Sequence, residues 1–114
     1  MNRRILFVCG KARRRSATAF ALFQDLPGTE VDFAGLSRDA DEPLTQDHIQ
    51  WADLICVMER RQKARLTRLF PRDLAETRIA CLDIPDKYAF MQTELIDLLR
   101  SKMHPHLGET RGSP

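Results

Sequence analysis

The sequence has 114 residues, of which 43% are hydrophobic and 30% are charged, and its formal net charge is +2. These values are ordinary for one globular domain, and so small a net charge gives no global field that would favour nucleic acid. No apolar run approaches the roughly 18 residues that a membrane-spanning helix needs, and the run near the start is too short for a signal peptide. We therefore expect a cytoplasmic protein that has no membrane partner.

The number and spacing of the cysteines exclude a disulfide-rich domain and a zinc-binding domain. Three cysteines, spaced far apart and without a C-x-x-C pair, fit neither a disulfide scaffold nor a zinc site. Cys56 and Cys81 each lie inside an apolar run, which predicts that both are small buried hydrophobic residues. The histidines show no metal-ligand spacing, so we expect no metal and no cofactor.

Apolar runs alternate along the chain with stretches of helical spacing. Thr45 is placed to cap the second helix. Residues 1–103 are expected to form one domain, whereas 104–114 lack periodicity and predict a flexible C-terminal tail. Strands are expected at 4–9, 30–34, 53–58 and 77–83, and helices at 16–26, 46–51, 59–70 and 92–103.

This alternation predicts an α/β fold with a parallel sheet and helices on both faces. Val31 and Phe33 alternate with polar neighbours, which is typical of an edge strand, whereas the third run is nearly all apolar and therefore central. Right-handed crossovers then favour a four-stranded sheet in the order 2-1-3-4. In that order the topological switch point lies at the carboxyl end of the first strand, where Cys9 stands.

A short pattern follows the first strand: Cys9, five residues, Arg15 and then Ser16. A loop between a strand and a helix points backbone N–H groups and a helix N-terminus at one small volume, which suits an anion. The same positive field favours the thiolate form of a cysteine. The pattern therefore predicts a thiolate nucleophile aimed at a bound phosphate.

The loop after Cys9 is the expected phosphate-binding segment. Its backbone N–H groups can donate to phosphate oxygens, Gly10 permits unusual backbone angles, and Arg15 can add a bidentate pair. Cys9 would attack phosphorus in line, and water would hydrolyse the cysteinyl-phosphate. Ser16 either hydrogen-bonds the thiolate or caps the helix, and the two roles are compatible. The other members of the expected segment are Lys11, Ala12, Arg13 and Arg14.

The leaving group of such a reaction needs a proton, and the candidate donors follow the fourth strand. Asp83 at the strand end lies two strands from Cys9, roughly 10 Å away, which is too far. Asp86 stands three residues further along, and an extended chain of that length covers about 10 Å. We therefore predict that Asp86 is the general acid. Tyr88 either lines the mouth of the site or packs half-buried, and both readings stay open.

The sequence resembles the low-molecular-weight protein tyrosine phosphatases, and more closely a shorter branch of predicted phosphatases, up to about Met103. The resemblance implies their fold, which is phosphotyrosine protein phosphatase I-like and flavodoxin-like. It also implies that Cys9 is the nucleophile, Arg15 the phosphate clamp, Ser16 the thiolate partner and Asp86 the general acid. The implied substrate is a phosphotyrosyl protein or a small phosphomonoester. The resemblance rests on the segments Ile5-Leu6-Phe7-Val8-Cys9, Arg15-Ser16, Ala52-Asp53-Leu54-Ile55-Cys56-Val57-Met58-Glu59 and Ile84-Pro85-Asp86-Lys87-Tyr88.

The loop departs from the usual family pattern at several positions. Lys11, Ala12 and Arg14 stand where the family has Gly, Asn and a second Cys, while Ala17 and Lys87 replace two prolines. In the family the Asn braces the loop through side-chain hydrogen bonds. The second Cys can protect the nucleophile in a disulfide, so its loss opens the thiol to irreversible over-oxidation.

These departures keep other functions open. One is a phosphate- or polyanion-binding module with weak turnover. Another is a phosphatase for nucleotides or RNA ends, because Lys11, Arg13 and Arg14 add positive charge beside the pocket, which makes nucleic acid a candidate partner. Arsenate reduction on this fold needs a downstream cysteine pair that reaches the nucleophile, and Cys56 and Cys81 are expected to be buried in strands.

Overall fold

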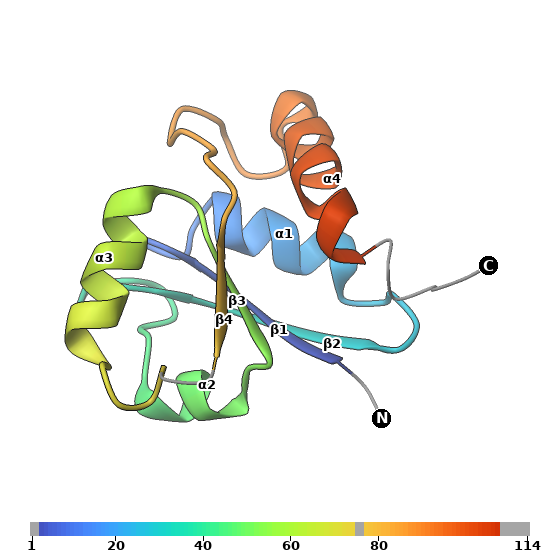
Figure 1. The fold of residues 1–114 in the computed structure, drawn as a ribbon. Coiled ribbons are helices and arrows are strands. Elements are labelled where there is room, and N and C mark those ends of the chain that lie inside the picture. Colours follow the sequence, from blue (N-terminus) through green and yellow to red (C-terminus); the bar gives the residue numbers. More distant parts are fainter. Residues whose placement is uncertain (1–2, 75–76, 108–114) are drawn as a thin grey trace.

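The computed structural model describes residues 3–74 and 77–107. Four strands form one parallel sheet in the order β2-β1-β3-β4, which confirms the predicted fold class and strand order. Helices α1 and α4 cover one face of the sheet, and α2 and α3 cover the other (Figure 1). The elements are β1 (Arg3–Cys9), α1 (Arg15–Phe23), β2 (Thr29–Gly35), α2 (Gln46–Trp51), β3 (Leu54–Val57), α3 (Arg60–Leu69), β4 (Arg78–Cys81) and α4 (Thr93–Leu107).

The two central strands are buried because helices pack on both of their faces. Alternate side chains of β1 point to opposite faces of the sheet and therefore enter two separate core layers. Ile5 and Phe7 lie in the layer beneath α1 and α4. Leu6 and Val8 lie in the layer beneath α2 and α3. This double burial fixes the register of β1 and, with it, the place where its carboxyl end delivers Cys9.

The ends of the first two helices have local causes. α1 stops at Phe23, three residues before the predicted end, because the chain turns at Pro27-Gly28, where Gly28 has a left-handed φ of 75°. Thr45 caps α2 as predicted. Its Oγ1 accepts the backbone N–H of His48 at 3.4 Å, and the Nδ1 of His48 accepts the backbone N–H of Thr45 at 3.0 Å.

The two strand cysteines differ in exposure. Cys56 in β3 is fully buried, as predicted. Cys81 is only partly buried, and its prediction as a buried hydrophobic residue is wrong. The reason is that β4 is an edge strand with one neighbour, so its side chains are less completely covered. β4 also ends at Cys81, two residues before the predicted end.

Helix α4 corrects the predicted boundary of the C-terminal tail. It runs to Leu107, so residues 104–107 are helical, and only 108–114 of the predicted tail lie outside the described residues. Leu95, Leu99 and Met103 are buried at a four-residue spacing, and Leu107 continues the same stripe against the core. The guanidinium of Arg3 donates to the carbonyl of His106 and so holds the last turn despite Pro105. Among the described helices, none is long and apolar enough to cross a membrane.

Candidate active site

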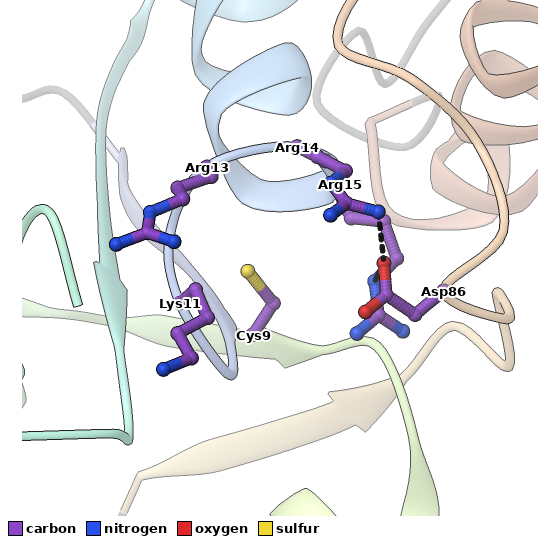
Figure 2. Close-up of a pocket in the computed structure, with 6 residues that line it drawn as sticks. All are labelled: Cys9, Lys11, Arg13, Arg14, Arg15 and Asp86. Atoms are coloured by element: carbon purple, nitrogen blue, oxygen red, sulfur yellow. Dashed lines mark ion pairs between the residues drawn. The ribbon is translucent and has the colours of Figure 1, made fainter. Parts of the chain in front are cut away.

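A pocket of about 240 Å³ lies beyond the carboxyl end of β1 (Figure 2). It stands at the predicted switch point, where the chain leaves β1 for α1. All of its lining residues except one come from the segment 9–15, and the exception, Asp86, comes from the chain after β4. The topology therefore brings the predicted acid to the predicted nucleophile. The lining residues are Cys9, Lys11, Arg13, Arg14, Arg15 and Asp86.

The thiol of Cys9 is held by two hydrogen-bonding groups at the base of the pocket. Its Sγ lies 3.0 Å from the hydroxyl of Ser16 and accepts the backbone N–H of Ala12 at 3.3 Å. Both partners stabilise a negative charge on sulfur. Ser16 is the second residue of α1 and Arg14 is the N-cap residue, so the alternative role of Ser16 as the helix cap is wrong.

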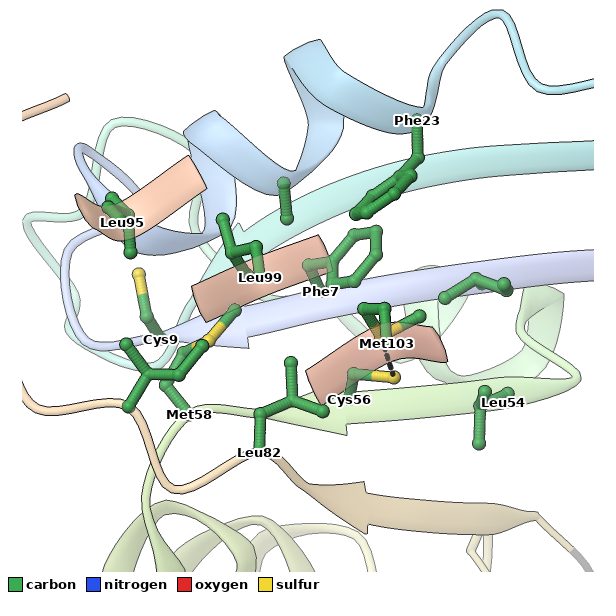
Figure 3. Close-up of a cluster of buried hydrophobic side chains, with 13 residues drawn as sticks. Phe7, Cys9, Phe23, Leu54, Cys56, Met58, Leu82, Leu95, Leu99 and Met103 are labelled. Carbon is green, nitrogen blue, oxygen red and sulfur yellow. Dashed lines mark hydrogen bonds between the residues drawn. The ribbon is translucent and has the colours of Figure 1, made fainter. Parts of the chain in front are cut away.

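The hydrophobic core fixes the base of this site. Cys9 belongs to the same buried cluster as Met58 of the chain after β3 and Leu95 and Leu99 of α4 (Figure 3). A thiol embedded in close-packed side chains has little freedom to move. Cys56 lies deeper in this cluster, and burial raises the pKa of its thiol to about 12. Of these two cysteines, Cys9 lines the pocket beyond β1.

Arg15 is 3% exposed and is anchored on one side only. Its Nη1 donates to Oε2 of Glu59 and to the carbonyl of Ile84, each at 2.6 Å. Its Nε lies on the pocket side, 3.8 Å from Oδ1 of Asp86. This anchoring leaves the edge formed by Nε and Nη2 available for two oxygens of an anion.

Glu59 is a site residue that the sequence reasoning did not single out. It follows β3 and is the N-cap residue of α3. Burial raises the pKa of its carboxyl, but hydrogen bonds from Arg15 and Arg61 outweigh that effect, so the net pKa is lowered. A signal was present, because Glu59 ends one of the segments that carry the family resemblance and follows the strand beside β1.

Asp86 lines the pocket, as the length of chain between the fourth strand and this residue predicts. Its half-exposed carboxylate lies 3.8 Å from Arg14 Nη1 and 3.8 Å from Arg15 Nε. Tyr88 does not line the pocket. It packs, half-buried, against the cluster beneath α4, and the Nζ of Lys87 lies 5.6 Å from the centre of its ring. Of the two readings of Tyr88, the structure favours packing.

The described part of the chain offers no metal site. Within residues 3–74 and 77–107, no group of three or more histidine, cysteine or acidic side chains could hold an ion.

Comparison with known proteins shows which solved structures share the fold of this chain. No protein-family model matches the sequence, and no curated protein matches it at a significant level. Solved structures match it over nearly its whole length. YwlE arginine phosphatase from Geobacillus stearothermophilus is 24% identical, with 98% of each chain covered and a TM-score of 0.73. Wzb of Vibrio vulnificus in complex with benzylphosphonate is 21% identical, with 96% of this chain and 99% of that chain covered and a TM-score of 0.77. The tyrosine phosphatase Wzb from Escherichia coli K30 in complex with phosphate is 20% identical, with 98% of this chain and 100% of that chain covered and a TM-score of 0.74.

The chain has the fold of the low-molecular-weight protein tyrosine phosphatases. Within this fold, the altered loop has one left-handed residue. The left-handed residue is Ala12, with a φ of 61°, and Gly10 has no left-handed angle, so the conformational role expected of Gly10 is wrong. Asn tolerates the left-handed region better than Ala does. This accounts for the Asn that the resemblance leads one to expect at position 12.

The loop of this phosphatase fold is pinned from outside by the chain after β2. The backbone N–H groups of Leu36, Ser37 and Asp41 donate to the carbonyls of Cys9, Gly10 and Lys11, each at 2.9 Å. These three bonds fix the loop without the side-chain brace of an Asn.

Two acidic residues of that segment form ion pairs with two cations of the expected phosphate-binding segment, residues 10–16, which we call the phosphate loop. Lys11 Nζ lies 2.6 Å from Oδ1 of Asp39, and Arg13 Nε lies 2.9 Å from Oδ1 of Asp41. The hydrogen bond from Lys11, together with one from Ser37, lowers the pKa of Asp39 to about 2. A signal for these pairs existed in the sequence, since both the cations and the carboxylates are spaced two residues apart.

Proposed function

We propose that this chain is a cysteine-dependent phosphomonoesterase of the protein tyrosine phosphatase type. The observation that carries the proposal is the meeting of Cys9, Arg15 and Asp86 in one pocket of about 240 Å³. The fold adds support, because the similar structures include enzymes described as phosphatases, and two of them hold a phosphonate or a phosphate. A working Cys9 must be reduced, so we further propose a reducing compartment such as the cytoplasm.

In the first step, the phosphate lies above Cys9 with its oxygens facing the loop. The Nε–Nη2 edge of Arg15 donates to two of those oxygens, because Nη1 is already bound by Glu59 and Ile84. The thiolate attacks phosphorus, so an S–P bond forms while the P–O bond to the leaving group breaks. The protonated carboxyl of Asp86 gives its proton to the departing oxygen.

In the second step, water hydrolyses the cysteinyl-phosphate. The carboxylate of Asp86 accepts a proton from the water as its oxygen bonds to phosphorus, and the electron pair of the S–P bond returns to sulfur. The Ser16 hydroxyl, 3.0 Å from Sγ, donates its hydrogen to the thiolate that leaves. The products are inorganic phosphate and the free enzyme.

Hydrolysis of p-nitrophenyl phosphate and of phosphotyrosyl peptides tests this proposal. We expect turnover by the wild type and none above background for Cys9→Ser. Asp86→Asn should lower kcat by about 10²–10⁴-fold on a poor leaving group, and by less on an activated one. Asp83→Asn is the matched control, because Asp83 lies outside the pocket. Wild-type activity no higher than that of Cys9→Ser would refute the proposal.

We rank the alternative of a phosphatase for RNA or nucleotide ends second, because the loop cations that suggested it have carboxylate neighbours. Lys11 and Arg13 are paired with Asp39 and Asp41, and Arg14 lies near Asp86. Cations that are already paired add little field for a polyanion. A phosphate-binding module without turnover keeps the same anion site, and phosphate binding by a catalytically silent wild type would identify it.

A further inference from the structure

A second cationic hollow lies on the other side of the phosphate loop. Helix α3 carries five basic residues and no acidic one, and three of its arginines face one hollow of about 340 Å³. We call this hollow the α3 arginine site. It is lined by Gly10, Leu36, Arg61, Gln62, Arg65 and Arg68.

The α3 arginine site adjoins the catalytic pocket. Gly10 lines the α3 arginine site, while its chain neighbours Cys9 and Lys11 line the catalytic pocket. Consecutive Cα atoms are about 3.8 Å apart. The two hollows therefore share the phosphate loop as a wall. A ligand that occupied both hollows would pass over the phosphate loop from the catalytic pocket to the arginines of α3.

No carboxylate among the lining residues neutralises the positive charge of the α3 arginine site. Arg61 bonds to Oε1 of Glu59 at 2.8 Å. In the described part of the chain, Arg65 and Arg68 have no ion pair, and no carboxylate lines the hollow. This contrasts with the phosphate loop, where Lys11 and Arg13 are each paired. The free positive field beside the active site thus belongs to α3.

We propose that the α3 arginine site binds acidic side chains that flank the phosphorylated residue of a polypeptide substrate. The inference rests on the proposed phosphatase function and names its substrate class. Guanidinium groups match carboxylates in bidentate geometry. Proteins that bind single-stranded nucleic acid typically add aromatic side chains on which the bases stack, and no aromatic residue lines the hollow. The observations therefore favour an acidic polypeptide over RNA.

The test compares Arg65→Gln/Arg68→Gln with the wild type. Arg61 stays in place because it bonds to Glu59, which anchors Arg15. Arg100→Gln/Lys102→Gln on α4 is the matched control, since it removes the same charge from exposed positions away from the hollow. The substrates are p-nitrophenyl phosphate and two phosphotyrosyl peptides, one with glutamates around the phosphotyrosine and one with glutamines instead.

The wild type should favour the acidic peptide in kcat/KM by about fivefold at low salt, and high salt should reduce this preference. The Arg65→Gln/Arg68→Gln variant should lose the preference while its rate on p-nitrophenyl phosphate stays near that of wild type. The control should keep the preference. Equal rates of the wild type on the two peptides, or an equal loss in the control, would overturn the inference.

Peptide binding to Cys9→Ser, measured by fluorescence anisotropy, separates this inference from the proposed function. Tighter binding of the acidic peptide, removed by adding Arg65→Gln/Arg68→Gln, supports the site even when no turnover is found. Equal binding of the two peptides overturns it. A single-stranded oligoribonucleotide that competes more strongly than the acidic peptide also overturns it, because the occupant would then be nucleic acid.

Discussion

At the scale of single residues, the site depends on carboxylates that fix its cations. Glu59 bonds to Nη1 of Arg15 and leaves the opposite edge of the guanidinium facing the pocket. Asp39 and Asp41 likewise accept hydrogen bonds from Lys11 and Arg13 and hold these two side chains in place. An arginine that is already oriented loses less freedom when it binds a phosphate.

Glu59→Gln tests the role of this anchor. The substitution removes a charged partner from a buried guanidinium, so we expect a loss of about 1–3 kcal/mol in the free energy of unfolding. We also expect a higher KM for p-nitrophenyl phosphate, because Arg15 is less well oriented. Urea unfolding and steady-state kinetics measure the two effects. Glu94→Gln on α4 is the control, and a Glu59→Gln enzyme that matches it in both assays would contradict the assignment.

Asp39 gives a prediction for pH. The folded-state pKa of Asp39 is lowered from 3.8 to about 2, first by the hydrogen bond from Lys11 and next by the one from Ser37. Because the folded value lies below the unfolded one, the pair stabilises the protein above about pH 4, and this contribution is lost as the pH falls through about 2. Carboxyl-carbon NMR should show a midpoint of about 2 for Asp39. Lys11→Met should move the midpoint upward, and a wild-type midpoint near 3.8 would refute the pairing.

At the scale of elements, the end of β2 supports the loop that follows β1. A Cβ atom at Gly35 would lie 2.6 Å from the carbonyl oxygen of Gly10 and 2.6 Å from the Cβ of Ala40. Gly35 is therefore required by the close approach of the two segments. A Cβ at Gly10 would have no atom within 4 Å.

Gly35→Ala should therefore push the phosphate loop out of place. We expect a loss of about 1–3 kcal/mol in stability and a fall in kcat/KM on p-nitrophenyl phosphate. Gly10→Ala is the control for stability and should remain within about 0.5 kcal/mol of wild type. Thermal unfolding and kinetics measure both variants. A Gly35→Ala protein with wild-type stability would show that the two segments are less tightly packed than described.

Helix α4 supplies a second prediction at this scale. A chain that stops after Met103 lacks Leu107 and the carbonyl that accepts from Arg3, whereas a chain that stops after Leu107 keeps both. We expect the shorter chain to be less stable by about 1–2 kcal/mol, because Leu107 is only partly buried. Urea unfolding of the two truncations measures the difference. Equal stabilities would contradict the role of the last turn.

At the scale of the whole molecule, the sequence predicts the strand order and the main site residues, but it does not predict the ion pairs that form between distant segments. The strand order followed from alternation, and Cys9, Arg15 and Ser16 stand within one short segment. Asp86 was found because chain length limits its reach. The missed features depend on segments that meet only in the folded state, since Asp39, Asp41 and Glu59 find their partners through tertiary contacts. The helical end of α4 was missed for the same reason, because its last turn is held by β1.

The sheet also separates the cysteines. Cys81 pairs with Val57 and Val57 pairs with Val8, so Cys81 lies two strands from the β1 residue next to Cys9. That span is about 10 Å, and a disulfide needs Cα atoms within about 7 Å. We expect peroxide to inactivate the enzyme without forming a disulfide between Cys9 and Cys81, and dithiothreitol to restore little activity. Peptide mapping that finds a Cys9–Cys81 disulfide within one chain would contradict this prediction.

The most direct test of the central claim is to trap the phosphorylated enzyme. Asp86→Asn, mixed with an activated aryl phosphate and quenched quickly, should accumulate a phosphoryl group on Cys9, because the group that activates water is lost while attack by sulfur remains. Intact-protein mass spectrometry followed by peptide mapping locates it, and Asp86→Asn/Cys9→Ser provides the comparison for a thiol-dependent adduct. We predict one phosphoryl group per chain, bound to Cys9 sulfur. An enzyme that turns over the same substrate while its phosphoryl group appears on another residue, or on none, would contradict the account.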